Sequence, residues 1–443
     1  MTYKEKEINE FIDFIDSTPN SYLCTENIRK KLVEKGYREL TFNSIWEYDC
    51  IGGKFFITKN NSSLIAFNIP KNKSDIVGFN ITATHNDSPS FNIKTNPEIY
   101  SEGYLKLNVD GYGGMINYSW LDRPLSIAGR VILKDKNEYK AININIDKDL
   151  LVIPSQAIHI NREVNTKNEL NKQKDMLPIL SLTNDLKVKD IIEIYLKDNN
   201  YLYDSICDYD LYLYNRDKAK IMGLNNEFIL APRLDDLACV WPAYKSFITA
   251  NNDLSINVLS IFNNEEIGSL TSQGADSTFL SDVLNRIAKL VNKDVITLLN
   301  NSMVISADNA HAIHPNATEK SDSTNKVYLN KGVVIKHHTN YTTDALTSSI
   351  FKGICDNGNI NYQDFASKSD MRCGSTLGGI SQSQVSIDSI DIGIPQLAMH
   401  SANELIGTDD LISMYYAMLE FYNTTICKEK DAVKVLSNKK KGL

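Results

Sequence analysis

An apolar run that ends in two adjacent carboxylates is the feature that most limits what this chain can fold into. Residues Val258–Phe262 have the pattern of a buried strand, and Glu265 and Glu266 follow them, with Gly268 just beyond. Because neighbouring residues point in different directions, one carboxylate can hold a metal ion while the other acts on a water beside it. Two adjacent glutamates alone are a weak signal, since most such pairs are solvated surface residues.

Other segments place similar side chains directly after an apolar strand pattern or before a helical one. These side chains are His85, Asp87, Asp235, Asp308 and His400. Carboxylate oxygens and imidazole nitrogens are the donors that zinc and similar ions accept. Strand and helix patterns also alternate after residue 228, which is typical of an α/β fold with ligand sites at the carboxyl ends of its strands. The sequence therefore predicts a metallohydrolase built on an α/β sheet.

The length of 443 residues exceeds one ordinary core and predicts two domains, or one domain with a large insertion. Residues 1–94 carry two helical patterns, a hairpin and a strand, and form the first part of a catalytic domain. Residues 95–227 carry short alternating segments, among them DIIEIYLKD, which predict an inserted β-rich domain. Residues 228–443 return to strands and helices and complete the catalytic domain.

Composition excludes several classes of partner. The formal net charge is −8, and the Lys and Arg residues are scattered, which argues against nucleic acid binding. No apolar stretch is long enough to span a bilayer, and residues 1–17 lack the apolar core of a signal peptide. The seven cysteines form no CxxC pair and indicate reduced thiols. We therefore expect a cytoplasmic protein with neither nucleic acid nor membrane as a partner.

Each metal-ligand candidate, taken alone, also has an ordinary structural interpretation. Asp87 either orients the imidazole of His85 towards a metal or merely caps a histidine at a strand end. Asp235 and Asp236 precede a helical pattern, where a helix N-cap and an acidic first turn explain them well, Asp236 in particular. His400 is a lone histidine after an apolar segment, and such a residue is more often a satisfied core or loop side chain than a ligand.

Several donors of suitable type at the strand ends of one α/β pattern are harder to explain without a metal. Their number matches two ions that share one bridging aspartate, and two ions about 4 Å apart generate hydroxide near neutral pH and polarise a carbonyl. Other chemistries fit less well. A GxSxG elbow is absent, Gly111–Gly114 lacks the Lys-Ser/Thr of a phosphate loop, and Cys373 has no histidine close in sequence. His314 fits a substrate or backbone contact better than a metal ligand.

These segments, in this order, resemble the aspartyl aminopeptidases, a family of dinuclear zinc exopeptidases. The resemblance covers nearly the whole chain, through GGKFFITKNNSSLIAF, THNDSP, SWLDRPLSIAGRVIL, AIHINR, APRLDDL, NNEEIGS, SADNAHAIHPN, KGVVIK, SDMRCGSTLGGI and PQLAMHSANE. It implies a three-layer zinc-peptidase catalytic domain with an inserted β-rich, barrel-like domain that serves as a dimer contact or lid. It also implies a homo-oligomer, a dodecamer built from dimers.

The resemblance further implies which residues hold two divalent ions. His85 and Asp308 would bind one ion, Glu266 and His400 the other, and Asp235 would bridge them. Zinc is the expected metal, although manganese and cobalt accept similar ligands.

The same resemblance implies catalytic roles for three further residues. Glu265 would be the general base, which takes a proton from the attacking water and passes it to the departing amine. Asp87 would orient the first metal-binding histidine. His159 would reach the substrate carbonyl from a neighbouring subunit.

The family prefers peptides with an N-terminal Asp or Glu, whose side chain needs a cation or several donors in its pocket. Lys336 is the candidate that the family pattern offers, with His311 and Tyr341 as further pocket residues. From the residues alone, a surface lysine at a strand edge is the better interpretation of Lys336. The chain departs from the family pattern in the loop after Lys336, where it has two histidines at 337–338 and where Tyr341 stands about two residues earlier than usual. It also has Asp236 where the family usually has Asn.

The main hypothesis is an aminopeptidase that releases an acidic N-terminal residue from peptides. An aminopeptidase with broader specificity is the alternative, because the loop after Lys336 departs from the family pattern. A non-catalytic shell protein is a third hypothesis, but such a protein has no physical need to keep a complete set of ligands and a base.

Overall fold

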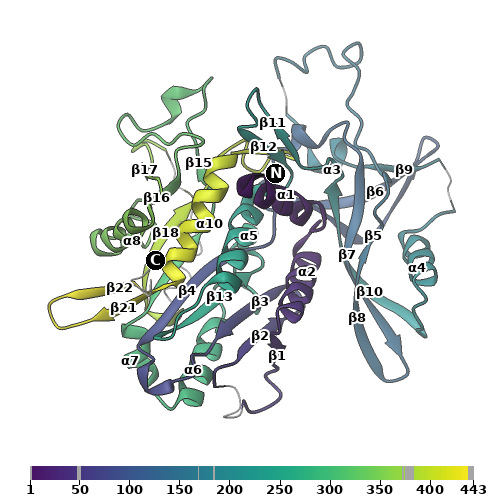
Figure 1. Ribbon diagram of the computed structural model, residues 1–443. Helices are drawn as coiled ribbons and strands as arrows, with labels where there is room; N and C mark the ends of the chain where they lie inside the picture. Colours follow the sequence, from purple (N-terminus) through teal and green to yellow (C-terminus); the bar gives the residue numbers. More distant parts are fainter. Residues whose placement is uncertain are drawn as a thin grey trace.

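A computed structural model describes the chain apart from residues 1, 47–50, 168, 183–184, 372–373, 375–383 and 438–443. Cys373 and most of the SDMRCGSTLGGI segment therefore lie outside the described residues. Figure 1 shows a layered α/β part and, on its right in that view, a separate β-rich part.

A nine-stranded sheet forms the centre of the layered part. Its strands, in spatial order, are β1 (Arg38–Glu39), β2 (Lys54–Lys59), β3 (Ser63–Asn68), β13 (Ser255–Phe262), β4 (Gly78–His85), β14 (Met303–Ala307), β18 (Asp388–Gly393), β16 (Val333–His337) and β17 (Tyr362–Ala366). The neighbouring strands β13, β4, β14 and β18 run parallel to one another. Every residue of β4, β13 and β14 is buried, as expected for parallel strands covered on both faces.

Helices cover both faces of this sheet. One face carries α1 (Tyr3–Asp16), α2 (Ser21–Glu34), α5 (Leu234–Thr249), α8 (Ala345–Gly358) and α10 (Thr408–Tyr422), and the other carries α6 (Phe279–Val291) and α7 (Val295–Asn300). Along β13, Leu259 and Ile261 pack into the first core, and Ile256 and Val258 into the second. This alternation is the period of two that a strand imposes, and it confirms the three-layer α/β prediction.

The β-rich part has its own sheet and core. Its strands, in spatial order, are β8 (Glu138–Asn145), β7 (Leu125–Asp135), β10 (Ser205–Asn215), β5 (Ser90–Ser101), β6 (Tyr104–Tyr112) and β9 (Ile179–Ser181). All pairings are antiparallel, and among the described residues β8 and β9 do not pair with each other, so the sheet is open rather than a closed barrel. The sheet begins at Ser90, and the domain boundaries at 94/95 and 227/228 stay predictions.

Two helices accompany this second sheet, α3 (Lys172–Asp175) and α4 (Val188–Asp198). The DIIEIYLKD segment lies within α4, so its interpretation as an alternating strand was wrong. Val188, Ile192 and Leu196 are its buried residues, and their spacing of four places them on one helical face against the β-rich core. The apolar residues between them gave a false appearance of alternation.

A small third sheet contributes side chains to the first core. It consists of β11 (Lys220–Met222), β12 (Phe228–Ala231), β20 (Glu404–Gly407), β19 (Pro395–Leu397) and β15 (Ala310–His311). A two-stranded hairpin of β21 (Thr424–Lys428) and β22 (Val433–Ser437) extends from the layered part, on the left of Figure 1.

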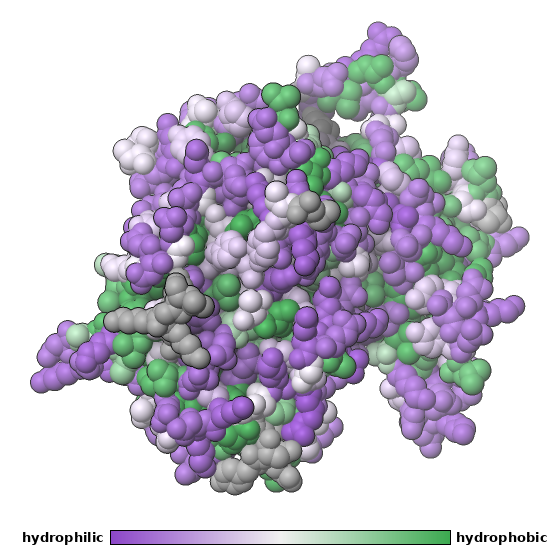
Figure 2. All heavy atoms as spheres, viewed as in Figure 1, coloured by the Kyte–Doolittle hydropathy of each residue, from purple (hydrophilic) through white to green (hydrophobic). Residues whose placement is uncertain are grey.

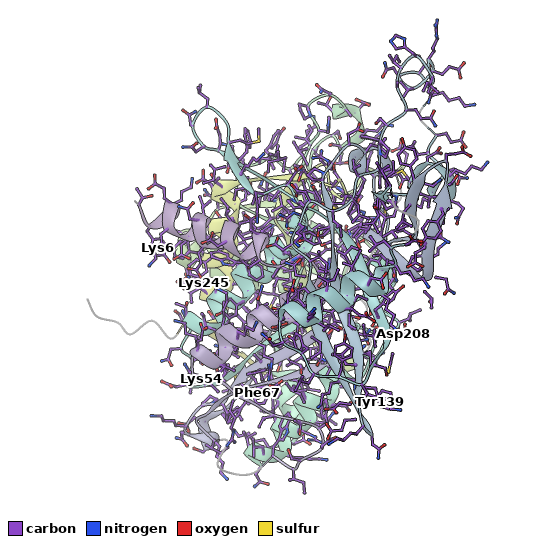
Figure 3. The ribbon with its side chains drawn as sticks, turned by 90° about the vertical axis from the view of Figure 1, so that its right-hand side faces the viewer. Lys6, Lys54, Phe67, Tyr139, Asp208 and Lys245 are labelled. Carbon is purple, nitrogen blue, oxygen red and sulfur yellow. The ribbon has the colours of Figure 1, made fainter. Side chains whose placement is uncertain are left out.

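The face of the molecule in Figure 2 is predominantly polar. In Figure 2 hydrophilic residues cover most of the visible face, and apolar residues are scattered among them. Figure 3 turns the molecule by 90° and places Lys6 and Lys245 at one edge, with Tyr139 of β8 and Asp208 of β10 at the other. Among the described helices, none has the length and apolar character needed to cross a membrane.

Candidate metal centre

The ends of three adjacent parallel strands bring the predicted side chains to one edge of the large sheet. His85 is the last residue of β4, Asp308 follows β14, and Glu265 and Glu266 lie in a short 3-10 turn after β13. Because β13, β4 and β14 are neighbours, their carboxyl ends meet. Asp235 joins them from the first turn of α5, and His400 from the connection between β19 and β20.

Asp235 lies between two histidines. Its Oδ1 is 3.5 Å from Nε2 of His85, and its Oδ2 is 3.3 Å from Nε2 of His400. Nε2 of His85 is also 3.9 Å from Oδ1 of Asp308, and Nε2 of His400 is 3.3 Å from Oε1 of Glu266. Each oxygen of Asp235 thus faces a different histidine, which is the arrangement that a bridging carboxylate requires.

The other nitrogen of each histidine ring is engaged by a main-chain carbonyl. Nδ1 of His85 lies 3.1 Å from the carbonyl oxygen of Asp87, and Nδ1 of His400 lies 3.1 Å from that of Gly114. A carbonyl only accepts, so both rings donate from Nδ1, and a neutral ring would then offer its Nε2 to a cation. Both Nε2 atoms point into the same cluster of carboxylates.

The residues present fit divalent cations. Two groups of side chains place potential ligand atoms within 4.8 Å of one another, one of His85, Asp235, Asp236 and Asp308, the other of Asp235, Glu266 and His400. Asp235 belongs to both groups. Within the described chain, Oδ1 of Asp235, Oδ1 of Asp236 and Oε1 of Glu266 are buried carboxylate oxygens without a hydrogen-bond donor. Such oxygens are costly to bury unless a cation or a proton compensates them.

The pKa shifts of the cluster residues also indicate an excess of negative charge. Burial raises the pKa of Glu265 and Glu266, and neighbouring carboxylates add to the effect. Burial disfavours the charged form of His400, but Asp235 and Glu266 outweigh it and raise the pKa of His400 to about 11. The pKa of Asp235 is lowered instead, because contacts with the two histidines outweigh its burial. Cations in the cluster would favour the charged carboxylates and the neutral imidazoles.

Asp236 is a buried member of the cluster that sequence reasoning assigned to the helix start. Its side chain is 0% exposed, and its Oδ2 accepts a hydrogen bond of 3.3 Å from the main-chain N–H of His85. Neither Asp235 nor Asp236 caps α5, and both have non-helical backbone angles. An acidic pair before a helix looks the same in sequence whether it caps the helix or faces a metal, so the pattern gave no signal for the second arrangement.

Asp87 holds the turn that carries the two glutamates. Its Oδ1 accepts a hydrogen bond of 3.2 Å from the main-chain N–H of Glu265, and its Oδ2 accepts one of 3.2 Å from that of Glu266. Oδ1 also lies 3.4 Å from Nδ1 of His85. Asp87 therefore contacts both the turn after β13 and the end of β4.

A cavity of about 320 Å³ opens beside these carboxylates. Besides the cluster itself, its lining includes Asn309, Ala310, His311, Lys336, Tyr341, Phe365, Ser367, Gly374 and Met399. The three predicted pocket residues therefore all line one cavity. Phe365, Ser367 and Met399 were not predicted, because their segments carry no residue type that marks a pocket.

Lys336 is buried at 3% exposure, so its interpretation as a surface lysine at a strand edge was wrong. Its Nζ lies 3.3 Å from Oδ2 of Asp308 and 5.7 Å from the ring centroid of Tyr341. Burial opposes the charged form, but Asp308 and further acidic groups outweigh it and raise the pKa of Lys336. Lys336 therefore contributes a positive charge to the lining of this cavity, next to Asp308. His159 is exposed and is absent from this lining, and its role stays a prediction.

Glu404 forms hydrogen bonds with the main chain of two cluster residues and was not predicted as a site residue. It is 1% exposed, and its carboxylate accepts hydrogen bonds from the main-chain N–H groups of Asp235, at 2.9 Å, and His400, at 2.6 Å.

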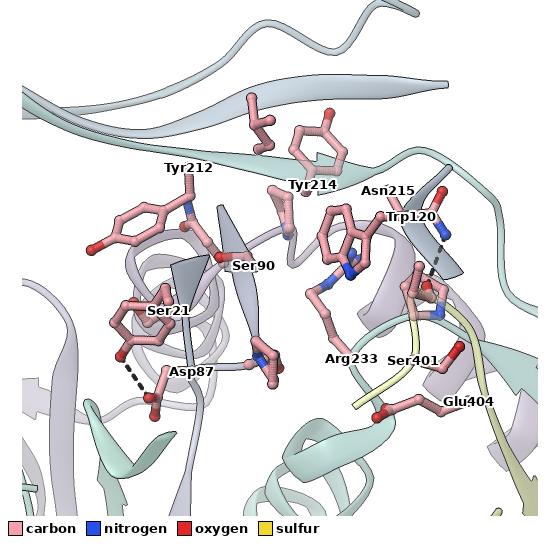
Figure 4. A pocket seen from close by; sticks show the side chains of 18 residues that line it. Ser21, Asp87, Ser90, Trp120, Tyr212, Tyr214, Asn215, Arg233, Ser401 and Glu404 are labelled. Carbon is pink, nitrogen blue, oxygen red and sulfur yellow. Dashed lines mark hydrogen bonds between the residues drawn. The ribbon is translucent and has the colours of Figure 1, made fainter. Parts of the chain in front are cut away.

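Asp87 and Glu404 also line a second, narrow pocket of about 40 Å³ between the layered and β-rich parts (Figure 4). Arg233 and Trp120 also line this pocket, and its volume suffices for a water.

Comparisons with known proteins identify relatives along nearly the whole chain. The model of a family described as "Aminopeptidase I zinc metalloprotease (M18)" matches residues 14–422. A protein of Clostridium novyi (strain NT) named "Probable M18 family aminopeptidase 2" is 44% identical over 438 residues, which are 96% of this chain and 100% of that protein.

Solved structures share the fold. A chain in a cryo-EM structure of the Ape4 and Nbr1 complex is 32% identical, with a TM-score of 0.89 over 95% of this chain and 86% of that one. A dodecamer of mApe1 from S. cerevisiae is 27% identical, with a TM-score of 0.81 over 95% of this chain and 97% of that one. With a family model over most of its length and a relative at 44% identity, this chain belongs to the M18 family of zinc metallo-aminopeptidases.

Proposed function

We propose that this M18 aminopeptidase removes N-terminal Asp or Glu residues from peptides with the help of two divalent ions. The observation that carries the proposal is the placement of Asp235 between two histidines, beside a cavity that holds a buried lysine. The first feature supports two ions, and the second supports an acidic substrate side chain.

His85 and Asp308 would hold one ion, Glu266 and His400 the other, and Asp235 both. Zinc fits this set of nitrogen and oxygen donors, and manganese and cobalt accept it as well. When bound, the ions supply Lewis acidity, which activates a water near neutral pH and polarises the peptide carbonyl.

The proposed general base is Glu265. Its side chain lines the cavity beside the cluster, and its main-chain N–H donates a hydrogen bond to Asp87. As a carboxylate it can take a proton from the attacking water and return that proton to the departing amine. Asp87 would position both Glu265 and His85, and His159 would reach the substrate carbonyl of a neighbouring subunit.

Lys336 provides the physical basis for acidic specificity. A buried ammonium group can form a charge-assisted hydrogen bond with the carboxylate of an N-terminal Asp or Glu. Tyr341 lies against Lys336, and His311 lies at the exposed side of the same cavity. A neutral N-terminal residue would leave the lysine paired with Asp308 alone.

We also propose a cytoplasmic homo-oligomer, a dodecamer built from dimers. The proposal is supported by the solved dodecamer of mApe1, and the location by the free thiols of five described cysteines. The runner-up function is a broader aminopeptidase in which the loop after Lys336 has changed the pocket.

The first test measures N-terminal residue release from Asp-, Glu-, Leu- and Ala-terminated peptides, with EDTA and after zinc or manganese is added back. We expect cleavage of the acidic peptides, at least a hundredfold loss with EDTA, and recovery with metal. Equal rates on all four peptides would reject acidic specificity and keep the metal mechanism. No turnover with any metal would favour a non-catalytic shell protein.

The second test replaces Lys336 by Met. We expect kcat/KM for the Asp peptide to fall about ten- to a hundredfold, because one charge-assisted hydrogen bond contributes about 1.5–3 kcal/mol and 1.4 kcal/mol is tenfold. Activity on the Leu peptide should change less than threefold. Lys352→Met is the matched control, since Lys352 also pairs with an aspartate and lies over a tyrosine ring, outside the cavity. A parallel loss on both peptides would contradict a role in specificity.

A further inference from the structure

The segment Tyr112–Gly114 leaves the β-rich sheet at the end of β6 and passes directly against the metal cluster. A Cβ atom at Gly113 would lie 3.1 Å from Cβ of Glu266, and one at Gly114 would lie 3.6 Å from Nδ1 of His400. Gly113 also has a φ of +72°, which disfavours a side chain. The main chain of the β-rich part therefore lies in contact with two candidate ligands of the same ion.

The side chain of Tyr112 makes two hydrogen bonds. Its hydroxyl donates a hydrogen bond of 2.6 Å to Oδ2 of Asp87, and it accepts one of 2.9 Å from Nδ2 of Asn264. The tyrosine ring is fixed from the other side by Tyr212 of β10, with ring centroids 5.5 Å apart and an interplanar angle of 83°. A short hydrogen bond to a carboxylate from a ring held in this way restricts the rotation of that carboxylate.

The carboxylate of Asp87 also accepts hydrogen bonds from the main chain of both glutamates. Its two oxygens accept the N–H groups of Glu265 and Glu266, and the carbonyl oxygen of Asp87 accepts from Nδ1 of His85. A change in the orientation of Asp87 would therefore move the turn after β13 and loosen the ring of His85 together. Asn264 immediately precedes this turn, so Tyr112 contacts the turn by two routes.

We propose that Tyr112 is a positioning residue, through which the β-rich part fixes Asp87 and thereby the metal-binding and general-base side chains. Docking of the β-rich part thus completes the metal centre of its own subunit. The effect on Glu265 rests on the proposed function, whereas the effect on the ligands Glu266 and His85 requires only that they bind metal.

The test compares Tyr112→Phe with Tyr214→Phe. Both substitutions remove one hydroxyl from a largely buried tyrosine of the β-rich part, but the hydroxyl of Tyr214 bonds to Asn145, at 2.8 Å, within that part. Zinc affinity is measured by competition with a chelator, and kcat and KM with an Asp-terminated peptide. For Tyr112→Phe we expect about tenfold weaker zinc binding and about tenfold lower kcat, with KM within twofold. Tyr214→Phe should change none of these more than twofold.

A double-mutant cycle with Asp87→Asn tests the route. If Tyr112 acts through Asp87, adding Tyr112→Phe to Asp87→Asn should weaken zinc binding less than twofold further. Effects that multiply in the double variant would overturn the proposed route. If Tyr112→Phe lowers the melting temperature but leaves the zinc affinity unchanged, Tyr112 contributes to stability alone. That result would overturn the proposal. The zinc titration decides this even if the acidic peptide proves to be the wrong substrate.

Discussion

Replacing Glu265 by Gln is expected to lower kcat on an Asp-terminated peptide about a thousandfold and to leave two zinc ions bound per chain. A general base in this position contributes about 10²–10⁴ to the rate, and the amide of Gln cannot accept the proton. The substitution preserves side-chain size, and the main-chain hydrogen bond to Asp87 remains available. KM should change little, because the carboxylate acts on the water rather than on the bound substrate.

The neighbouring residue provides the contrast. Glu266→Gln weakens a ligand of one ion, so we expect zinc content to fall towards one ion per chain together with activity. Zinc content by elemental analysis and single-turnover kinetics separate the two variants. A Glu265→Gln protein that keeps its zinc and hydrolyses peptides at the wild-type rate would remove Glu265 from the mechanism. Equal zinc loss in both variants would make Glu265 a ligand instead of a base.

The sequence predicted the residues at the strand ends because a parallel sheet leaves little freedom there. Once β13, β4 and β14 are neighbours, His85, Glu266 and Asp308 must lie at the same edge, whatever the loops do. These strands are rich in β-branched and other apolar residues, which made them recognisable in the sequence. The family resemblance then added the order of the segments and the pairing of ligands.

The residues that were missed depend on contacts between distant segments. Tyr112 belongs to the β-rich part, and its contact with Asp87 follows from the docking of two sheets, which no local pattern encodes. The burial of Lys336 depends in the same way on Asp308 and Tyr341 around it. The error in α4 had a different origin. In DIIEIYLKD the apolar residues satisfy both a period of two and a helical period, and only packing against the β-rich core decides between them.

Replacing Asp235 by Asn is expected to remove both ions and to lower activity at least a thousandfold. Asp235 is the one side chain that contributes to both candidate ligand groups, and its two oxygens face different histidines. An amide offers a single neutral oxygen and cannot bridge two cations. The adjacent Asp236→Asn should instead keep two ions, because an Asn oxygen can still accept from the N–H of His85.

Thermal unfolding with and without zinc measures this difference without relying on turnover. A ligand that binds only the folded state stabilises it by about 2.7 kcal/mol when its concentration is a hundred times its Kd. The melting temperatures of the wild type and Asp236→Asn should therefore rise with added zinc, whereas that of Asp235→Asn should stay constant. A zinc-dependent rise in Asp235→Asn equal to that of the wild type would contradict a bridging role and place both ions on the remaining ligands. Loss of the rise in both variants would instead make Asp236 a ligand, as its burial within the first group allows.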